Sequence, residues 1–170
     1  FFFVVFQIPE NTQIICISER LQKMCASHGI TKNIWTRPNP IDANRFKPLR
    51  GQRDDLRLRL TKFNTDDTVI SSIGKFNPNK NQIFLLKVLE HLPSQYKLIL
   101  AGPLSESGPF KQRDQEYFDS IVRVIERNRL ESRVELNPVF LSNPEDFMNL
   151  SDVYAITSLT EGLGTPLIEA

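Results

Sequence analysis

Apolar and polar positions along the second half of the chain follow two alternating patterns. Short apolar runs, typical of buried strands, are each followed by a segment whose apolar residues lie three and four positions apart, as on one helix face. The runs predict strands at 68–73, 96–101, 133–136 and 153–157, and the segments predict helices at 78–92, 111–129 and 144–150, with a last helix after residue 164. Strands that alternate with helices predict a parallel sheet with helices on both faces, an α/β fold that binds ligands at the carboxyl ends of its strands.

The first part of the chain repeats this pattern on a smaller scale. Strands are expected at 13–17 and 33–36, on either side of a helix at 19–28 that Ser18 caps and Gly29 stops. The next stretch is rich in proline and charge, which predicts a linker with a short helix near its end. Three parts are therefore expected, with boundaries at 1–36, 37–67 and 68–170.

Composition limits the classes of function. A net charge of +1 over 170 residues argues against a broad nucleic-acid-binding surface. Cys16 and Cys25 have no metal-ligand spacing and are expected to be free thiols, typical of a reducing compartment. The apolar run Phe1–Phe6 is too short to span a membrane and lacks the layout of a signal peptide. With no initiator Met and a last helix that stops at Ala170, we expect a piece of a longer protein, truncated at both ends.

The segment Glu161–Glu169 contains two carboxylates separated by a glycine-rich turn, directly after an expected strand. The glycines permit positive φ and close approach of a ligand, while Thr165 can cap a helix and Pro166 suits its first turn. A helix N-terminus favours a phosphate group. The pattern predicts a sugar-nucleotide site with one carboxylate for each sugar. The alternative is an ordinary loop charge and a first-turn glutamate.

A second candidate lies after the expected strand 68–73. In the segment 74–80, Asn77 can cap a helix, and Lys75 and Lys80 flank its start, where they oppose the helix dipole. An anion held between the lysines would relieve that cost; otherwise they are solvated surface charges. Gly102 after the next strand fits either a ligand-facing turn or a simple one. Along the helix 111–129 arginines alternate with acids, which favours a solvated face.

Taken in order, these segments resemble a known family. Gly74-Lys75 with Lys80, Ala101–Pro103, and the paired glutamates of Glu161–Glu169 are similar to the nucleotide-binding half of GT-B glycosyltransferases, in the group 1 class called glycosyltransferase family four. The resemblance implies a Rossmann-like sheet. It identifies residues 1–36 as the tail of an N-terminal acceptor domain, 37–67 as an interdomain linker and 68–170 as an incomplete C-terminal nucleotide-sugar-binding domain.

The resemblance also implies roles for single residues. Lys75 and Lys80 would hold the diphosphate of a nucleoside-diphosphate sugar, Glu169 the ribose, and Glu161 would face the transferred sugar as the catalytic candidate. Segment 139–142 would border the base. The family commonly has arginine where this chain has Lys75, which offers a point charge without a bidentate fork. The remaining donor-binding residues implied are Gly74, Gly102, Gly162, Leu163, Gly164 and Thr165.

The implied function is a retaining glycosyltransferase that needs no metal or other cofactor. The acceptor, a sugar, lipid or glycan, would be bound by the N-terminal domain, and nucleic acid is not an expected partner. A cytoplasmic location is expected, and peripheral membrane association of the full-length protein is compatible with it. The 170 residues alone are expected to be inactive. The alternatives are a non-catalytic nucleotide-binding or scaffolding module of the same fold, or a GT-B sugar-nucleotide epimerase or phosphorylase.

Overall fold

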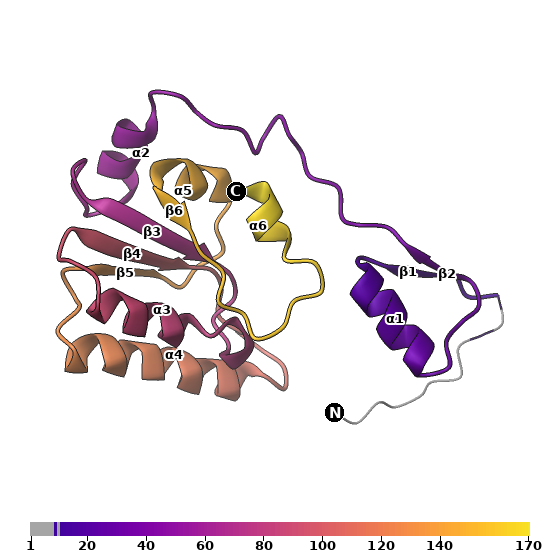
Figure 1. Cartoon of the computed structure of the whole chain (residues 1–170). Coiled ribbons are helices and arrows are strands. Elements are labelled where there is room, and N and C mark those ends of the chain that lie inside the picture. Colours follow the sequence, from indigo (N-terminus) through magenta and orange to yellow (C-terminus); the bar gives the residue numbers. More distant parts are fainter. Residues whose placement is uncertain (1–8, 10) are drawn as a thin grey trace. The chain divides into compact units, whose positions relative to one another are not determined.

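The computed structural model describes residue 9 and residues 11–170, so the apolar run Phe1–Phe6 lies outside the described residues. The chain divides into two compact units (Figure 1). The first is Phe1–Pro40 with Gly162–Thr165, and the second is Ile41–Glu161 with Pro166–Ala170. The division falls inside the expected linker of 37–67, but residues 41–67 group with the second unit instead of standing apart from it.

The first unit contains two short parallel strands and one helix. Strand β1, Ile14–Cys16, pairs with β2, Ile34–Thr36, and α1, Glu19–Ser27, connects them. Ser18 has the extended backbone of an N-cap, and its Oγ accepts a hydrogen bond from the Leu21 amide at 3.4 Å. The predicted elements and the cap are therefore present, each within two residues of its expected bounds.

The second unit is built on a four-stranded sheet in the order β5-β4-β3-β6. All three strand pairs are parallel, as predicted. The last strand is shorter than the expected 153–157. It ends at Tyr154, and further on the Thr157 hydroxyl donates hydrogen bonds to the backbone of the turn after β3. The bounds are Thr68–Ile73 for β3, Tyr96–Ala101 for β4, Val134–Asn137 for β5 and Val153–Tyr154 for β6.

Six helical segments surround this sheet, and one differs from its prediction. The expected helix over 78–92 is divided at Asn81, whose φ of +52° is left-handed. Asparagine tolerates this conformation better than most residues, so it separates a short 3₁₀ turn from the helix proper. The segments are α2, Arg53–Leu60; η1, Pro78–Lys80; α3, Gln82–Glu90; α4, Lys111–Arg127; α5, Pro144–Leu150; and α6, Thr165–Glu169.

Helices α3 and α4 cover one face of the sheet, and α2 and α5 cover the other (Figure 1). A hydrophobic core lies on each face. Along β4, Leu98 and Leu100 belong to the core shared with α3 and α4, whereas Ile99 and Ala101 belong to the core shared with α2 and α5. This alternation is the period of two that a strand imposes. Because helices cover both faces, the loops at the strand ends remain as the places where a ligand can reach the sheet.

Arg57 explains why residues of the expected linker belong to the second unit. Its side chain on α2 is fully buried. The guanidinium donates hydrogen bonds to the carbonyl oxygens of Leu150, Thr65 and Asp67 and pairs with Asp152 Oδ2 at 2.9 Å. The charge pattern of this helix gave no sign of burial. The contacts attach α2 to the end of α5 and the start of β3, which makes the segment part of the sheet's covering layer.

Candidate functional site

The loops after β3 and β4 meet through their backbones. The Gly74 amide donates to the Ala101 carbonyl at 2.8 Å, and the Phe76 amide donates to the Pro103 carbonyl at 3.1 Å. Gly102 has a φ of +138°, and a Cβ there would lie 2.3 Å from the Gly74 carbonyl oxygen. The structure thus brings the predicted Gly74 and Gly102 together, and glycine at 102 is required by close backbone approach within the protein.

The loop after β6 packs on the η1 turn after β3. The Asn79 side-chain amide donates to the Thr160 carbonyl, and the Leu159 amide donates to the Asn79 carbonyl, both at 2.8 Å. The Thr157 hydroxyl donates to the carbonyl oxygens of Lys80 and Asn81 at 3.1 Å. These bonds fix two loops that are distant in sequence against each other at the carboxyl edge of the sheet.

This packing produces an ion pair between two predicted site residues. Lys80 Nζ lies 2.5 Å from Glu161 Oε1, and both side chains are about three-quarters buried. The stem of Lys80 lies across Gly74, at 3.5 Å from the position that a Cβ would take there. Burial by itself raises the pKa of Glu161, but hydrogen bonds from Lys80 and Ser158 and attraction to Lys80 outweigh it and hold the pKa below its ordinary value.

A small cavity surrounds this pair. Its volume is about 10 Å³, so the ion pair almost fills the space and leaves room for at most one water molecule. Gln82, whose side chain is buried, holds the turn in place by donating from Nε2 to the Lys75 carbonyl at 3.1 Å. The described residues that line the cavity are Ser72, Ile73, Gly74, Lys80, Gln82, Ile156, Thr157, Ser158, Glu161 and Pro166.

Lys75 pairs with a residue that the sequence reasoning missed. Its Nζ lies 3.4 Å from Oδ2 of Asp114, a fully buried carboxylate in the first turn of α4. Asp114 also accepts hydrogen bonds from Ser105 at 2.5 Å and from Arg113 at 2.6 and 2.9 Å. Although burial acts to raise the pKa of Asp114, these partners and Lys75 bring it below its ordinary value. The spacing along the helix could have indicated that Asp114 is buried, because Asp114 stands four residues before Phe118 and so lies on the apolar face of α4.

Glu169 lies in a different pocket from Glu161. That pocket is about 250 Å³ in volume, and Arg45 pairs with Glu145 at 2.9 Å beside it. The structure therefore brings Lys80 and Glu161 together but does not place Glu169 with them in one cavity. The residues that line the pocket of Glu169 are Phe46, Lys47, Pro48, Glu145, Met148, Asn149, Ser151 and Ala170.

Of the two glycines in the turn of the motif, Gly164 has a positive φ and Gly162 does not. Gly164 has a φ of +71°, in the left-handed region that favours glycine. Helix α6 begins at Thr165. Thr165 is therefore the first residue of the helix, whereas it was expected as the N-cap, the position just before the helix. The candidates Gly162, Leu163, Gly164 and Thr165 group with the first unit, whereas the residues that line the cavity of Lys80 all belong to the second unit.

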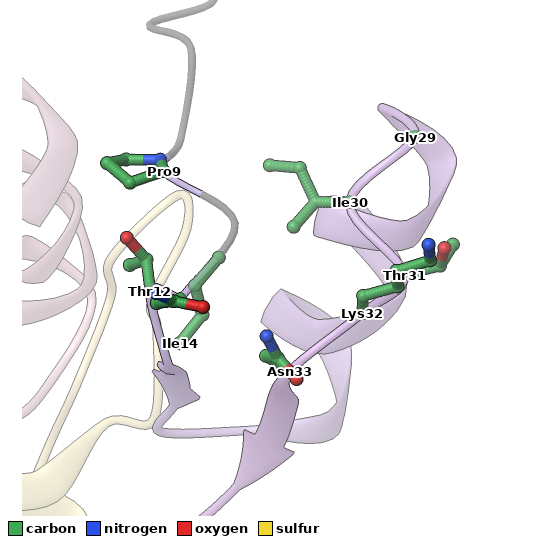
Figure 2. Close-up of a pocket in the computed structure, with 9 residues that line it drawn as sticks. Pro9, Thr12, Ile14, Gly29, Ile30, Thr31, Lys32 and Asn33 are labelled. Carbon is green, nitrogen blue, oxygen red and sulfur yellow. The ribbon is translucent and has the colours of Figure 1, made fainter.

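The first unit has a pocket of its own (Figure 2). Its volume is about 540 Å³, and Lys32 is the charged residue among those that line it. None of the predicted site residues lies there. The lining residues are Pro9, Asn11, Thr12, Ile14, Gly29, Ile30, Thr31, Lys32 and Asn33.

Two further observations concern metals and membranes. Within residue 9 and residues 11–170, no three His, Cys, Asp or Glu side chains gather as metal ligands would. No helix in this described part is both long and apolar enough to cross a bilayer.

The thiols of Cys16 and Cys25 are free, as expected, and their sulfur atoms lie 4.0 Å apart.

Comparison with known proteins identifies relatives of this chain. The chain is 28% identical over 173 residues to the phosphatidylinositol N-acetylglucosaminyltransferase GPI3 subunit of Saccharomyces cerevisiae, covering 98% of this chain and 35% of that protein. It is 30% identical over 139 residues to the putative glycosyltransferase EpsF of Bacillus subtilis, covering 78% of this chain and 32% of that one. The chain thus spans about a third of the length of these curated relatives.

Solved structures share the fold. HepE from Anabaena, crystallised in complex with UDP and glucose, superposes with a TM-score of 0.82 at 25% identity, covering 93% of this chain and 41% of HepE. WaaG, a glycosyltransferase involved in lipopolysaccharide biosynthesis, gives a TM-score of 0.78 at 14% identity, covering 97% of this chain and 43% of WaaG. The α/β fold with parallel sheets is therefore that of GT-B glycosyltransferases. Residues 56–170 match the family model described as "Glycosyl transferases group 1", and the chain belongs to this family.

Proposed function

We propose that the protein is a retaining glycosyltransferase and that its second unit binds the donor, a nucleoside-diphosphate sugar. The observation that carries the proposal is the Lys80–Glu161 ion pair, which joins a cation and a carboxylate at the carboxyl ends of β3 and β6. Support for a nucleotide-sugar donor comes from HepE, which was crystallised with UDP and glucose. UDP and UDP-glucose are therefore the nucleotide and the donor with which the proposal is tested.

Lys80 and Lys75 are suited to the diphosphate because both are cations on the loop after β3. When the sugar leaves, negative charge grows on the diphosphate, and fixed cations nearby stabilise that charge in the transition state. Lys80 already has a short contact with Glu161, so donor binding has to share or open this pair. The cavity around the pair is too small for a diphosphate, so the proposal requires the pair to open when the donor enters.

Glu161 is suited to the transferred sugar by its ionisation. Its lowered pKa keeps the carboxylate charged near neutral pH, so it acts as an anion and not as a proton donor. Glycosyl transfer develops positive charge on the sugar ring, as glycoside cleavage in general does. A carboxylate held beside that ring stabilises the charge more in the transition state than in the ground state, which raises turnover.

The remaining assignments belong to the same proposal. Glu169 binds the ribose, and the backbone of 162–165 contacts the phosphate and sugar. Gly74 and Gly102 let the loops after β3 and β4 pack closely on each other, which shapes the edge of the sheet where the donor binds. No metal or other cofactor takes part, because the lysines offset the charge of the leaving group. A part of the protein outside the second unit binds the acceptor, which is a sugar, a lipid or a glycan.

Two variants test the central assignment in the protein that contains this chain. Lys80→Ala should weaken binding of UDP about tenfold or more, because a charge-assisted hydrogen bond contributes roughly 1.5–3 kcal/mol. Binding of uridine, which has no phosphate, should change less than about twofold. Lys87→Ala is the matched control, since Lys87 is an exposed lysine on neighbouring α3. Isothermal titration calorimetry with both ligands measures these affinities.

Glu161→Gln keeps the shape of the side chain and removes its charge. It should lower turnover of UDP-glucose strongly without weakening UDP binding, because the sugar and not the nucleotide faces this residue and the substitution releases Lys80 from its ion pair. Glu169→Gln should instead weaken UDP and UDP-glucose alike. Wild-type turnover by Glu161→Gln would show that Glu161 does not act on the reacting sugar. Retained UDP binding with no turnover in the wild type would instead identify a non-catalytic nucleotide-binding module.

A further inference from the structure

Asp114 holds two cations at the edge of the candidate site. Its Oδ1 accepts two hydrogen bonds from the Arg113 guanidinium, at 2.6 Å from Nη2 and 2.9 Å from Nε. Its Oδ2 accepts from Ser105 and lies 3.4 Å from Lys75 Nζ. A single buried carboxylate therefore brings an arginine of α4 and a lysine of the β3 loop to the same place.

Lys75 and Arg113 are accessible to a ligand, whereas the carboxylate of Asp114 is not. Asp114 is fully buried, whereas the side chains of Lys75 and Arg113 are 41% and 49% exposed. Ser105 and Arg113 already occupy both carboxylate oxygens, so Lys75 is not needed to satisfy Asp114. The three charged groups together carry one net positive charge, and it lies on the exposed side chains.

Arg113 is also held in one orientation. The carbon at the centre of its guanidinium lies 4.4 Å from the centre of the Phe110 ring, in a cation–π arrangement. With Nε and Nη2 directed at Asp114, the second amino group of the fork, Nη1, is left for another acceptor. An arginine held in this way loses less conformational entropy when it binds an anion than a free surface arginine loses.

We propose that Asp114 positions Lys75 and Arg113 as a pair of cations for the donor diphosphate, and that Arg113 supplies the guanidinium of this site. The proposal rests on the proposed function and adds two residues to it. Lysine binds phosphate as a point charge, whereas a guanidinium can make directed hydrogen bonds to a phosphate oxygen. Arg113 is the binding residue, and Asp114 is a positioning residue that acts through both cations.

The test uses inorganic pyrophosphate as a probe that contains no base or sugar, in the protein that contains this chain. Arg113→Ala should weaken pyrophosphate binding about tenfold, and Arg113→Lys should restore only part of the loss, because it returns the charge without the fork. Arg123→Ala is the matched control, since it removes the same charge from an exposed position further along α4 and should change the affinity less than about twofold. Uridine binding should stay constant in all three variants.

Asp114→Asn distinguishes a positioning role from a purely electrostatic one, because the two roles change pyrophosphate affinity in opposite directions. The substitution makes the site more positive, so a purely electrostatic role predicts tighter pyrophosphate binding. Loss of positioning predicts weaker binding, and that is the expected result. Because Asp114 is buried, amide hydrogen exchange along α4 checks that the helix is still folded. Tighter binding by a folded Asp114→Asn variant would overturn the positioning role.

The outcomes distinguish this inference from the proposed function. If Lys80→Ala loses pyrophosphate binding while Arg113→Ala matches Arg123→Ala, the inference is wrong and the donor site around Lys80 stands. If the wild type binds neither pyrophosphate nor UDP, both proposals are wrong. Weakened pyrophosphate binding in Arg113→Ala and Asp114→Asn, with uridine binding unchanged, supports the cation pair.

Discussion

Gly102→Ala should separate the two loops that carry the candidate site. An added Cβ would lie 2.3 Å from the Gly74 carbonyl oxygen and 2.6 Å from its carbonyl carbon, closer than real Cβ atoms approach backbone atoms. Both of these neighbouring atoms belong to the backbone, which cannot rotate away as the end of a side chain can. The φ of +138° adds strain, because residues with a Cβ rarely adopt it.

The magnitude follows from these two contributions. Forcing extra atoms into a close contact costs about 1–3 kcal/mol, and holding alanine at an unfavourable φ costs on the order of 1–3 kcal/mol. Together they suggest a loss of about 4 kcal/mol in local stability, which corresponds to roughly a thousandfold change in an opening equilibrium. The loss falls where Gly74 and Lys75 leave β3, so pyrophosphate affinity should decrease as well.

Amide hydrogen exchange measures the effect at the contact itself. The Gly74 amide is bonded to the Ala101 carbonyl at 2.8 Å, and the amide of residue 102 is bonded to the Asn137 carbonyl at 3.0 Å. Both amides should exchange much faster in Gly102→Ala. Gly108→Ala is the control, since Gly108 has a φ of +81° with nothing within 4 Å of its Cβ position, so it adds strain without a clash. If each of the two amides exchanged at the same rate in Gly102→Ala as in Gly108→Ala, the reasoning would be refuted.

Three further predictions concern the rest of the second unit. Arg57→Leu should lower the free energy of unfolding by about 3–5 kcal/mol in urea titrations, because it leaves Asp152 and three carbonyl groups without their buried partner; a loss below about 1 kcal/mol would contradict this. The pKa of Glu161 is below the ordinary 4.5, so its ion pair stabilises the folded protein only while the carboxylate is charged. The difference in melting temperature between wild type and Glu161→Gln should therefore be largest above pH 4.5 and decline as the pH falls below it. A difference that does not change with pH would show that the pair contributes nothing to stability. Turnover of UDP-glucose in excess EDTA should equal turnover with magnesium, and loss of activity on chelation would show that a metal takes part.

Local sequence patterns predicted most of the elements. Strands β3 and β4 and helix α5 have the expected bounds, because apolar periodicity and flanking Gly and Pro residues act within a few positions along the chain. The division of the helix at Asn81 and the early end of β6 were not predicted. Both depend on contacts between the two loops, in which the Asn81 side chain and the Thr157 hydroxyl take part.

For the candidate site, the sequence by itself determined the residue types and their positions at strand ends. It placed Lys75, Lys80 and Glu161 at the carboxyl edge of a parallel sheet, where ligands bind in this class of fold. Only the tertiary structure decided which of them meet. Lys80 and Glu161 are 81 positions apart, and their pairing depends on how two loops pack. Asp114 and Arg57 were missed because burial depends on neighbouring elements, which a charge pattern along one helix does not contain.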